Sequence, residues 1–154
     1  MQTHAPVVNA FPLPSGAEAE IDALMQAFFS VFTNKNGVKP DLDAIHRMFL
    51  PQGLIIKCNG AEREIYTLQE FIEPRRQLLS GGRLIEFQEQ EVSARTDIFG
   101  SIAQRYSIYK KSGILDGQAF QARGVKAMQL IRMDGWKLVS LAWEDERDGL
   151  AIPD

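Results

Sequence analysis

The chain has 154 residues, of which 45% are hydrophobic and 24% charged, and its formal net charge is −3. This composition is that of a globular domain with an ordinary hydrophobic core. Acidic and basic residues are spread along the chain without a basic cluster, so nucleic acid is excluded as an expected partner.

Cysteine content and hydropathy exclude further classes. Cys58 is the only cysteine, so an intrachain disulfide is impossible and a packed strand thiol is expected. The opening residues MQTHAPVVNAFPLP lack the basic and long apolar regions of a secretion signal, and no window approaches 18 apolar residues. We therefore expect a cytoplasmic protein that does not enter a membrane.

Hydrophobic periodicity divides the chain into three parts. Residues 1–14 contain three prolines and no periodicity, which predicts a flexible arm. Residues 15–148 carry periodic apolar residues and are expected to form a single domain. Residues 149–154 are expected to form a short tail.

Two helices are predicted before residue 51. The first follows Ser15 and Glu18, which have capping-box spacing, and ends near residues 34–37. Its inward residues recur with helical spacing and are Ile21, Leu24, Met25, Phe28 and Phe32. A short second helix opens at residues 40–41 and stops before Pro51.

A short strand and a third helix follow. GLIIKC predicts a strand at 53–58, and NGAEREIY is expected to bring the chain back in the opposite direction. Thr67 and Glu70 form another capping box, which predicts a helix that is ended by Gly81 and Gly82. Pro74 either lies inside this helix or splits it, so a kink is expected.

From residue 83 onward the apolar period changes from 3.6 to 2. This predicts four long strands, at about 84–97, 101–112, 118–133 and 136–146. The apolar set of the first strand changes from odd to even positions near residues 89–91, which predicts a β-bulge. The predicted fold is therefore α+β, with three N-terminal helices packed on a curved four-stranded antiparallel sheet.

The closing segment RMDGWKLVSLAW, together with this order of elements, resembles the nuclear-transport-factor-2-like superfamily, especially its SnoaL-like and uncharacterised bacterial branches. FLPQGLII also resembles the family's passage from second helix to first strand. The resemblance implies a cone-shaped, cystatin-like fold with a cavity between sheet and helices. It implies no particular reaction, because the superfamily includes isomerases, dehydratases, cyclases, association domains and non-catalytic binders.

A two-residue turn at Asp134–Gly135 would pair Met133 with Trp136 and sort the last two strands into two faces. One face grades from apolar residues into Lys126, as the wall of a cone should. With the helices it predicts a ligand pocket formed by Phe28, Phe32, Tyr106, Lys126, Met128, Leu141 and Trp143. The other face predicts a homodimer interface formed by Ile131, Met133, Trp136 and Leu138.

The candidates for acid–base or electrostatic roles are Asp145, Tyr106, Arg105 and His46. A tyrosine hydroxyl opposite a carboxylate would suit enolisation or dehydration. Each candidate also has a simpler interpretation: an acidic chain end, a half-buried sheet aromatic, a surface ion pair and a surface histidine, respectively. Gln129 stands where related epoxide hydrolases carry an acid, and the long strands lack the histidine of scytalone-dehydratase-like enzymes.

No metal or cofactor is expected. His4 and His46 do not form a ligand set, and the phosphate-binding and nucleophile-elbow motifs are missing from the sequence. We therefore expect a small apolar molecule in the cone, bound by a protein that is either a simple binder or a cofactor-free isomerase, dehydratase or cyclase. The alternative is a non-catalytic dimerisation or protein-interaction domain.

Overall fold

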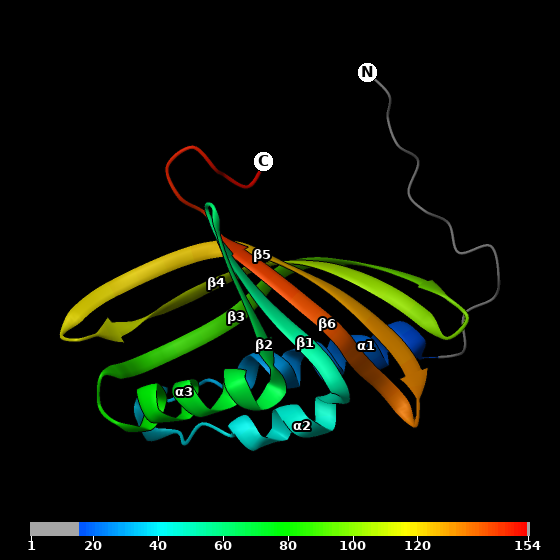
Figure 1. The fold of residues 1–154 in the computed structure, drawn as a ribbon, viewed down its shortest axis with the longest axis horizontal. Helices are drawn as coiled ribbons and strands as arrows, with labels where there is room; N and C mark the ends of the chain where they lie inside the picture. Colours follow the sequence, from blue (N-terminus) through cyan, green and yellow to red (C-terminus); the bar gives the residue numbers. More distant parts are fainter. Residues whose placement is uncertain (1–15, 154) are drawn as a thin grey trace.

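The computed structural model of the protein describes residues 16–153, which form a curved sheet with helices against its concave face (Figure 1). The predicted arm at 1–14 and the predicted cap Ser15 lie outside the described residues. No helix within 16–153 is long and apolar enough to cross a membrane.

The helices follow the predicted order and are α1 (Ala17–Ser30), α2 (Ile45–Met48) and α3 (Leu68–Ser80). α1 ends before the predicted 34–37, and α2 begins after the predicted 40–41. The predicted capping box of α3 is confirmed, because the Glu70 amide donates to Thr67 Oγ1 at 3.2 Å and the Thr67 amide donates to Glu70 Oε1 at 3.0 Å. Of the two alternatives for Pro74, the structure shows the first, because it lies inside α3 and does not split the helix.

The sheet is larger than predicted, and it is mixed. Its strands are β1 (Phe49–Asn59), β2 (Glu62–Thr67), β3 (Leu84–Phe99), β4 (Ile102–Leu115), β5 (Gln118–Met133) and β6 (Gly135–Asp145), in the order β2-β1-β6-β5-β4-β3. β1 is parallel to β6, and the other neighbours are antiparallel. The predicted four-stranded antiparallel sheet is therefore wrong, because the β1–β2 hairpin joins it through a long-range pairing that the local pattern does not reveal.

The predicted register beside the β5–β6 turn is also wrong. Met133 pairs with Gly135 rather than with Trp136, and the register shifts at Val139. This bulge turns Trp136 and Leu138 toward the helices, where only 5% and 0% of their surfaces are exposed. Both belong to the core and not to a dimer interface, whereas Ile131 is half-buried and Met133 is exposed.

β3 carries two register shifts, one between Ile85 and Gln88 and one between Glu91 and Ser93. The second lies beside the bulge predicted at residues 89–91. Bulges increase the local bend of a strand. They thus help to curve the sheet around the helices.

Asn34, which lies in the segment after α1, joins that segment to the connection between α3 and β3. Its side-chain amide donates to the carbonyls of Leu79 at 3.0 Å and Leu84 at 2.7 Å, and its oxygen accepts from the Phe87 amide at 2.7 Å. These bonds hold the helices at a fixed distance from the sheet at one end of the space between them.

Candidate functional site

A cavity of about 340 Å³ lies between the inner face of the sheet and helices α1 and α3. Phe28 lines it from α1, Phe32 from the turn that follows α1, and Phe71 from α3. The rings of Phe32 and Phe71 pack edge to face, 6.0 Å apart. The aromatic side chains therefore form the wall of the cavity without closing it.

A buried ion pair stands in the cavity wall. Lys126 Nζ lies 2.9 Å from Glu89 Oε1, and the side chains are only 6% and 8% exposed. The ammonium group also lies 4.3 Å from the ring centre of Tyr109 and 5.1 Å from that of Trp143. Burial lowers the pKa of Lys126, and the charge of Glu89 opposes that shift.

A second cluster of polar side chains, formed by Tyr109, Lys111 and Asp145, links β4 to β6. The buried hydroxyl of Tyr109 donates to Asp145 Oδ1, and Lys111 Nζ lies 2.9 Å from Asp145 Oδ2. Burial and then the Asp145 carboxylate raise the pKa of Tyr109. Burial alone would raise the pKa of Asp145, but Lys111 and the Tyr109 hydroxyl outweigh it, and this pKa is lowered.

These shifts move both groups away from general acid–base chemistry near neutral pH. A tyrosine with a raised pKa keeps its proton, and an aspartate with a lowered pKa is a weak base. The Tyr109–Asp145 pair therefore provides fixed polarity rather than a proton-transfer couple.

Gly124 makes room for this pair. It lies between Tyr109 and Asp145 in the registers of β4, β5 and β6. A Cβ atom at residue 124 would lie 2.2 Å from Tyr109 Oη and 2.4 Å from the Glu144 carbonyl oxygen. Only glycine fits here, because the tyrosine ring crosses its backbone.

Arg75 of α3 closes part of the cavity wall. Its guanidinium carbon lies 3.9 Å from the ring centre of Phe71 and 5.4 Å from those of Tyr66 and Trp143. Stacking of this kind restricts a guanidinium to one plane while its N–H groups remain available as donors.

No protein-family model and no curated protein match the chain. Solved structures match most of it. A nuclear transport factor 2-like superfamily protein from Salmonella enterica has a TM-score of 0.68 at 13% identity, over 84% of this chain and 90% of the other. The chain has the nuclear-transport-factor-2-like fold. A cystatin-like protein of unknown function from Nostoc punctiforme has a TM-score of 0.67 at 12% identity, over 88% and 96% of the two chains.

An association domain shares the nuclear-transport-factor-2-like fold as well. The structure of a putative Ca/calmodulin-dependent kinase II association domain from Exiguobacterium sibiricum has a TM-score of 0.65 at 12% identity, over 89% of this chain and 98% of that one. At such identities the likeness concerns the fold alone, so the site must be judged on its own side chains.

Five of the seven residues predicted for a pocket line the cavity, namely Phe28, Phe32, Lys126, Leu141 and Trp143. Met128 is buried on the same face but does not line the cavity. Tyr106 is 48% exposed on the opposite face, so its predicted place was wrong. β4 alternates, and it is residues 105, 107 and 109 that turn toward the helices.

The four predicted catalytic candidates do not come together. Asp145 lines the cavity. Arg105 faces inward but is held at 2.7 Å by Asp22 and at 3.1 Å by Glu91, so it fastens α1 to the sheet. His46 is exposed on α2. Between residues 16 and 153, no three His, Cys, Asp or Glu side chains are grouped to hold a metal ion.

Sequence reasoning missed Tyr109 and Arg75. The signal for Tyr109 was a glycine in the middle of β5, which marks close approach of another group. Arg75 gave no such signal, because a basic residue on an amphipathic helix is ordinarily solvated. Its place in the cavity wall depends on how α3 packs against β6.

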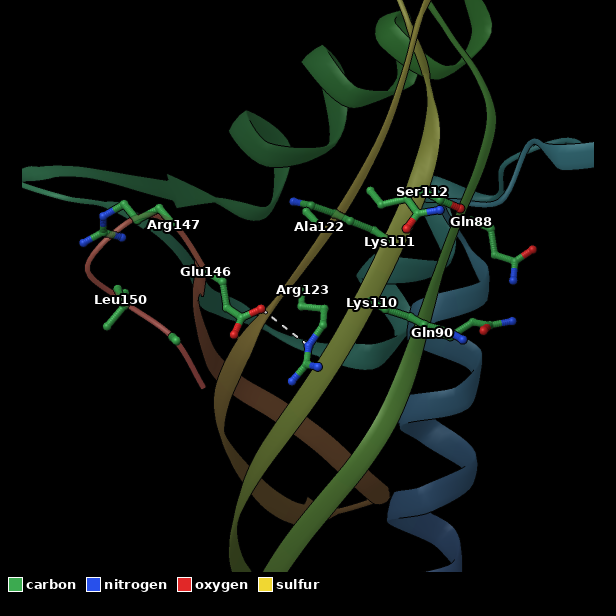
Figure 2. Close-up of a pocket in the computed structure, with 12 residues that line it drawn as sticks. Gln88, Gln90, Lys110, Lys111, Ser112, Ala122, Arg123, Glu146, Arg147 and Leu150 are labelled. Carbon is green, nitrogen blue, oxygen red and sulfur yellow. Dashed lines mark ion pairs between the residues drawn. The ribbon is translucent and has the colours of Figure 1, made fainter. Parts of the chain in front are cut away.

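A larger depression of about 760 Å³ lies on the face of β3, β4 and β5 that points away from the cavity, beside the C-terminal segment 146–153 (Figure 2). Figure 2 shows Gln90 and Lys110 on its one side and Arg147 on the other. Arg123 Nε lies 3.5 Å from Glu146 Oε1 within it. This polar depression suits an apolar ligand less well than the inner cavity does.

Proposed function

We propose that the protein binds a small, mainly apolar molecule between its sheet and helices α1 and α3. The observation that carries this proposal is the open cavity of about 340 Å³, which has aromatic walls and buried polar groups in one of them. Small-molecule sites typically measure about 300–1,000 Å³ and combine apolar lining with few polar groups.

Simple binding is better supported than catalysis. An isomerase or dehydratase needs a group that takes or gives a proton near neutral pH. The Tyr109–Asp145 pair is shifted away from that role, and Lys126 is already engaged by Glu89. The proposed activity is therefore that of a carrier or sensor of its ligand.

Filling the cavity is expected to weaken ligand binding. Ala122 lines the cavity from β5, and its replacement by phenylalanine will place a ring in that space. We expect the wild-type protein to bind N-phenyl-1-naphthylamine, a neutral probe that fluoresces in apolar surroundings, and Ala122→Phe to weaken the binding at least about tenfold, or by about 1.4 kcal/mol. The measurement is a fluorescence titration.

Ala119→Phe is the matched control. Ala119 lies on the same strand but is exposed on the other face, so the same ring there should leave the probe's affinity unchanged. Equal loss in both variants, or no probe binding by the wild-type protein, would contradict an internal binding site.

Homodimerisation through the outer face of the sheet is a second candidate function. Large apolar side chains are exposed on that face, including Leu54 at 41%, Ile102 at 59% and Met133 at 64%. Exposed apolar groups of this kind mark interaction surfaces when they are contiguous. Tyr106 lies among them, on β4.

Tyr106→Glu will separate such a dimer, because it places a charge in an apolar contact. Sedimentation equilibrium at micromolar concentration should give twice the chain mass for the wild-type protein and a single chain mass for the variant. Val38→Glu, at an exposed site outside the strands, should remain dimeric. A monomeric wild-type protein would exclude this function.

A further inference from the structure

We infer that the ligand of this cavity is an amphipathic anion, with an apolar body inside and a carboxylate or phosphate group bound by Arg75. The inference rests on the proposed function and adds the charge of the ligand. It is drawn from the ionic groups of the lining, which are Lys57, Arg75, Glu89, Lys111, Lys126 and Asp145.

The cavity carries an excess of positive charge. Its lining holds four cationic and two anionic side chains, although the whole chain has a net charge of −3. Both carboxylates are already used, because Glu89 pairs with Lys126 and Asp145 pairs with Lys111, each at 2.9 Å. Within residues 16–153, Lys57 and Arg75 form no ion pair.

Arg75 has donors to offer. Arg75 Nη1 donates a long hydrogen bond to the Phe71 carbonyl oxygen at 3.4 Å, and the guanidinium also interacts with the Tyr66 hydroxyl. The nearby carboxylate of Glu64 accepts a hydrogen bond from the Tyr66 hydroxyl and acts on Arg75 through its charge, without forming an ion pair with it. A guanidinium presents five N–H groups in a planar fork, and two of them match the two oxygens of a carboxylate or phosphate.

The surroundings of Arg75 make an anion there effective. The side chain is half-buried and stacked on Phe71, with the Tyr66 and Trp143 rings beside it. Burial lowers the pKa of Arg75, because the charge has lost part of its hydration. An anion would replace that hydration, and the aromatic stack already holds the guanidinium in one plane, so little conformational entropy is lost on binding.

The aromatic rings around Arg75 account for the apolar body of the inferred ligand. Phe71 and Trp143 contact Arg75 and line the cavity as well. An anion at Arg75 therefore places the rest of the molecule against apolar walls. A free inorganic ion would use the guanidinium but leave the cavity empty.

Ligands matched in length test this inference. Octanol, octanoate and octyl phosphate would each be titrated against bound N-phenyl-1-naphthylamine. We expect the dissociation constant of octanoate or octyl phosphate, measured by displacement of the probe, to be at least about tenfold lower than that of octanol. The anion with the lower dissociation constant identifies the anionic group of the ligand. The preference should fall with added NaCl, because salt screens the charge.

Variants assign the preference to Arg75. In Arg75→Gln the dissociation constant of octanol divided by that of the anion should fall toward one. Arg75→Lys should keep part of the preference for the anion. Arg76→Gln is the matched control, because Arg76 instead pairs with Asp43 and Glu73 outside the cavity, and it should keep the full ratio. A wild-type protein that binds the probe but does not prefer the anions would overturn this inference alone. Failure to bind the neutral probe would overturn the proposed function.

Discussion

Replacing Glu89 with glutamine is expected to lower the free energy of unfolding by about 3 kcal/mol, the usual cost of removing one partner of a buried ion pair. Glu89 faces Lys126 at 2.9 Å with little exposure of either side chain. Its loss leaves a buried ammonium group without a counter-charge. Urea unfolding followed by circular dichroism measures the change.

The pH dependence of this loss identifies its cause. Burial already holds the pKa of Lys126 below its usual 10.5, and removal of Glu89 will lower it further. The unfolded chain then binds the proton more tightly than the folded chain, so stability rises as pH increases from the folded pKa toward 10.5. The deficit of Glu89→Gln should therefore be largest at pH 7 and shrink toward pH 10.

Two further variants complete the test. Asp116→Asn removes an exposed partner of Arg83, 3.1 Å away, and should cost less than about 1 kcal/mol. Glu89→Leu combined with Lys126→Met removes both buried charges and should recover most of the stability lost in the single variant. A single variant as stable as wild type at pH 7 would mean that water reaches Lys126 in solution.

Gly124→Ala is expected to cost about 3 kcal/mol, at the upper end of the range for overpacking. The added methyl group would meet Tyr109 Oη at 2.2 Å and the Glu144 carbonyl oxygen at 2.4 Å. A strand backbone cannot move away cheaply, since Gly124 is paired on both sides. Thermal unfolding should show a Tm lower by about 10 °C.

Gly113→Ala provides the comparison on the neighbouring strand. Its Cβ would contact side-chain atoms of Leu84 and Phe87 at 3.2 Å, which can shift, and the Ile85 carbonyl oxygen at 3.3 Å, well beyond the 2.4 Å of the backbone contact at Gly124. We expect a cost below about 1 kcal/mol. If the two alanine variants were equally stable, Tyr109 would not cross Gly124 in solution as it does in the structure.

The sequence by itself determined the elements with strong local signals. The capping box at Thr67 and Glu70 starts α3. The strand predicted at 118–133 from its period-2 pattern has the same bounds as β5. The bulge of β3 lies beside its predicted place. Such features depend on side chains only a few residues apart, so the sequence displays them directly.

Only the tertiary structure decided the register and the direction of side chains near the site. The bulge at Val139 places Trp136 and Leu138 in the core, although strict alternation puts them outside. The parallel pairing of β1 with β6 likewise joins segments distant in sequence. One residue of register shift exchanges the two faces of a strand, and the burial of a large side chain against helices determines which register is stable.

The residues of the cavity also divide into those that the sequence could place and those that only the tertiary structure places. The sequence could place five residues at the cavity, because periodicity groups them on shared faces and the change from apolar residues to Lys126 indicates the concave face of the sheet. They are Phe28, Phe32, Lys126, Leu141 and Trp143. Tyr109 and Arg75 could not be placed, because each acquires its role from a neighbour supplied by another element: Asp145 of β6 for the hydroxyl and Trp143 of β6 beside the guanidinium. Periodicity tells which residues share a face, whereas long-range packing decides which charges and donors meet across it.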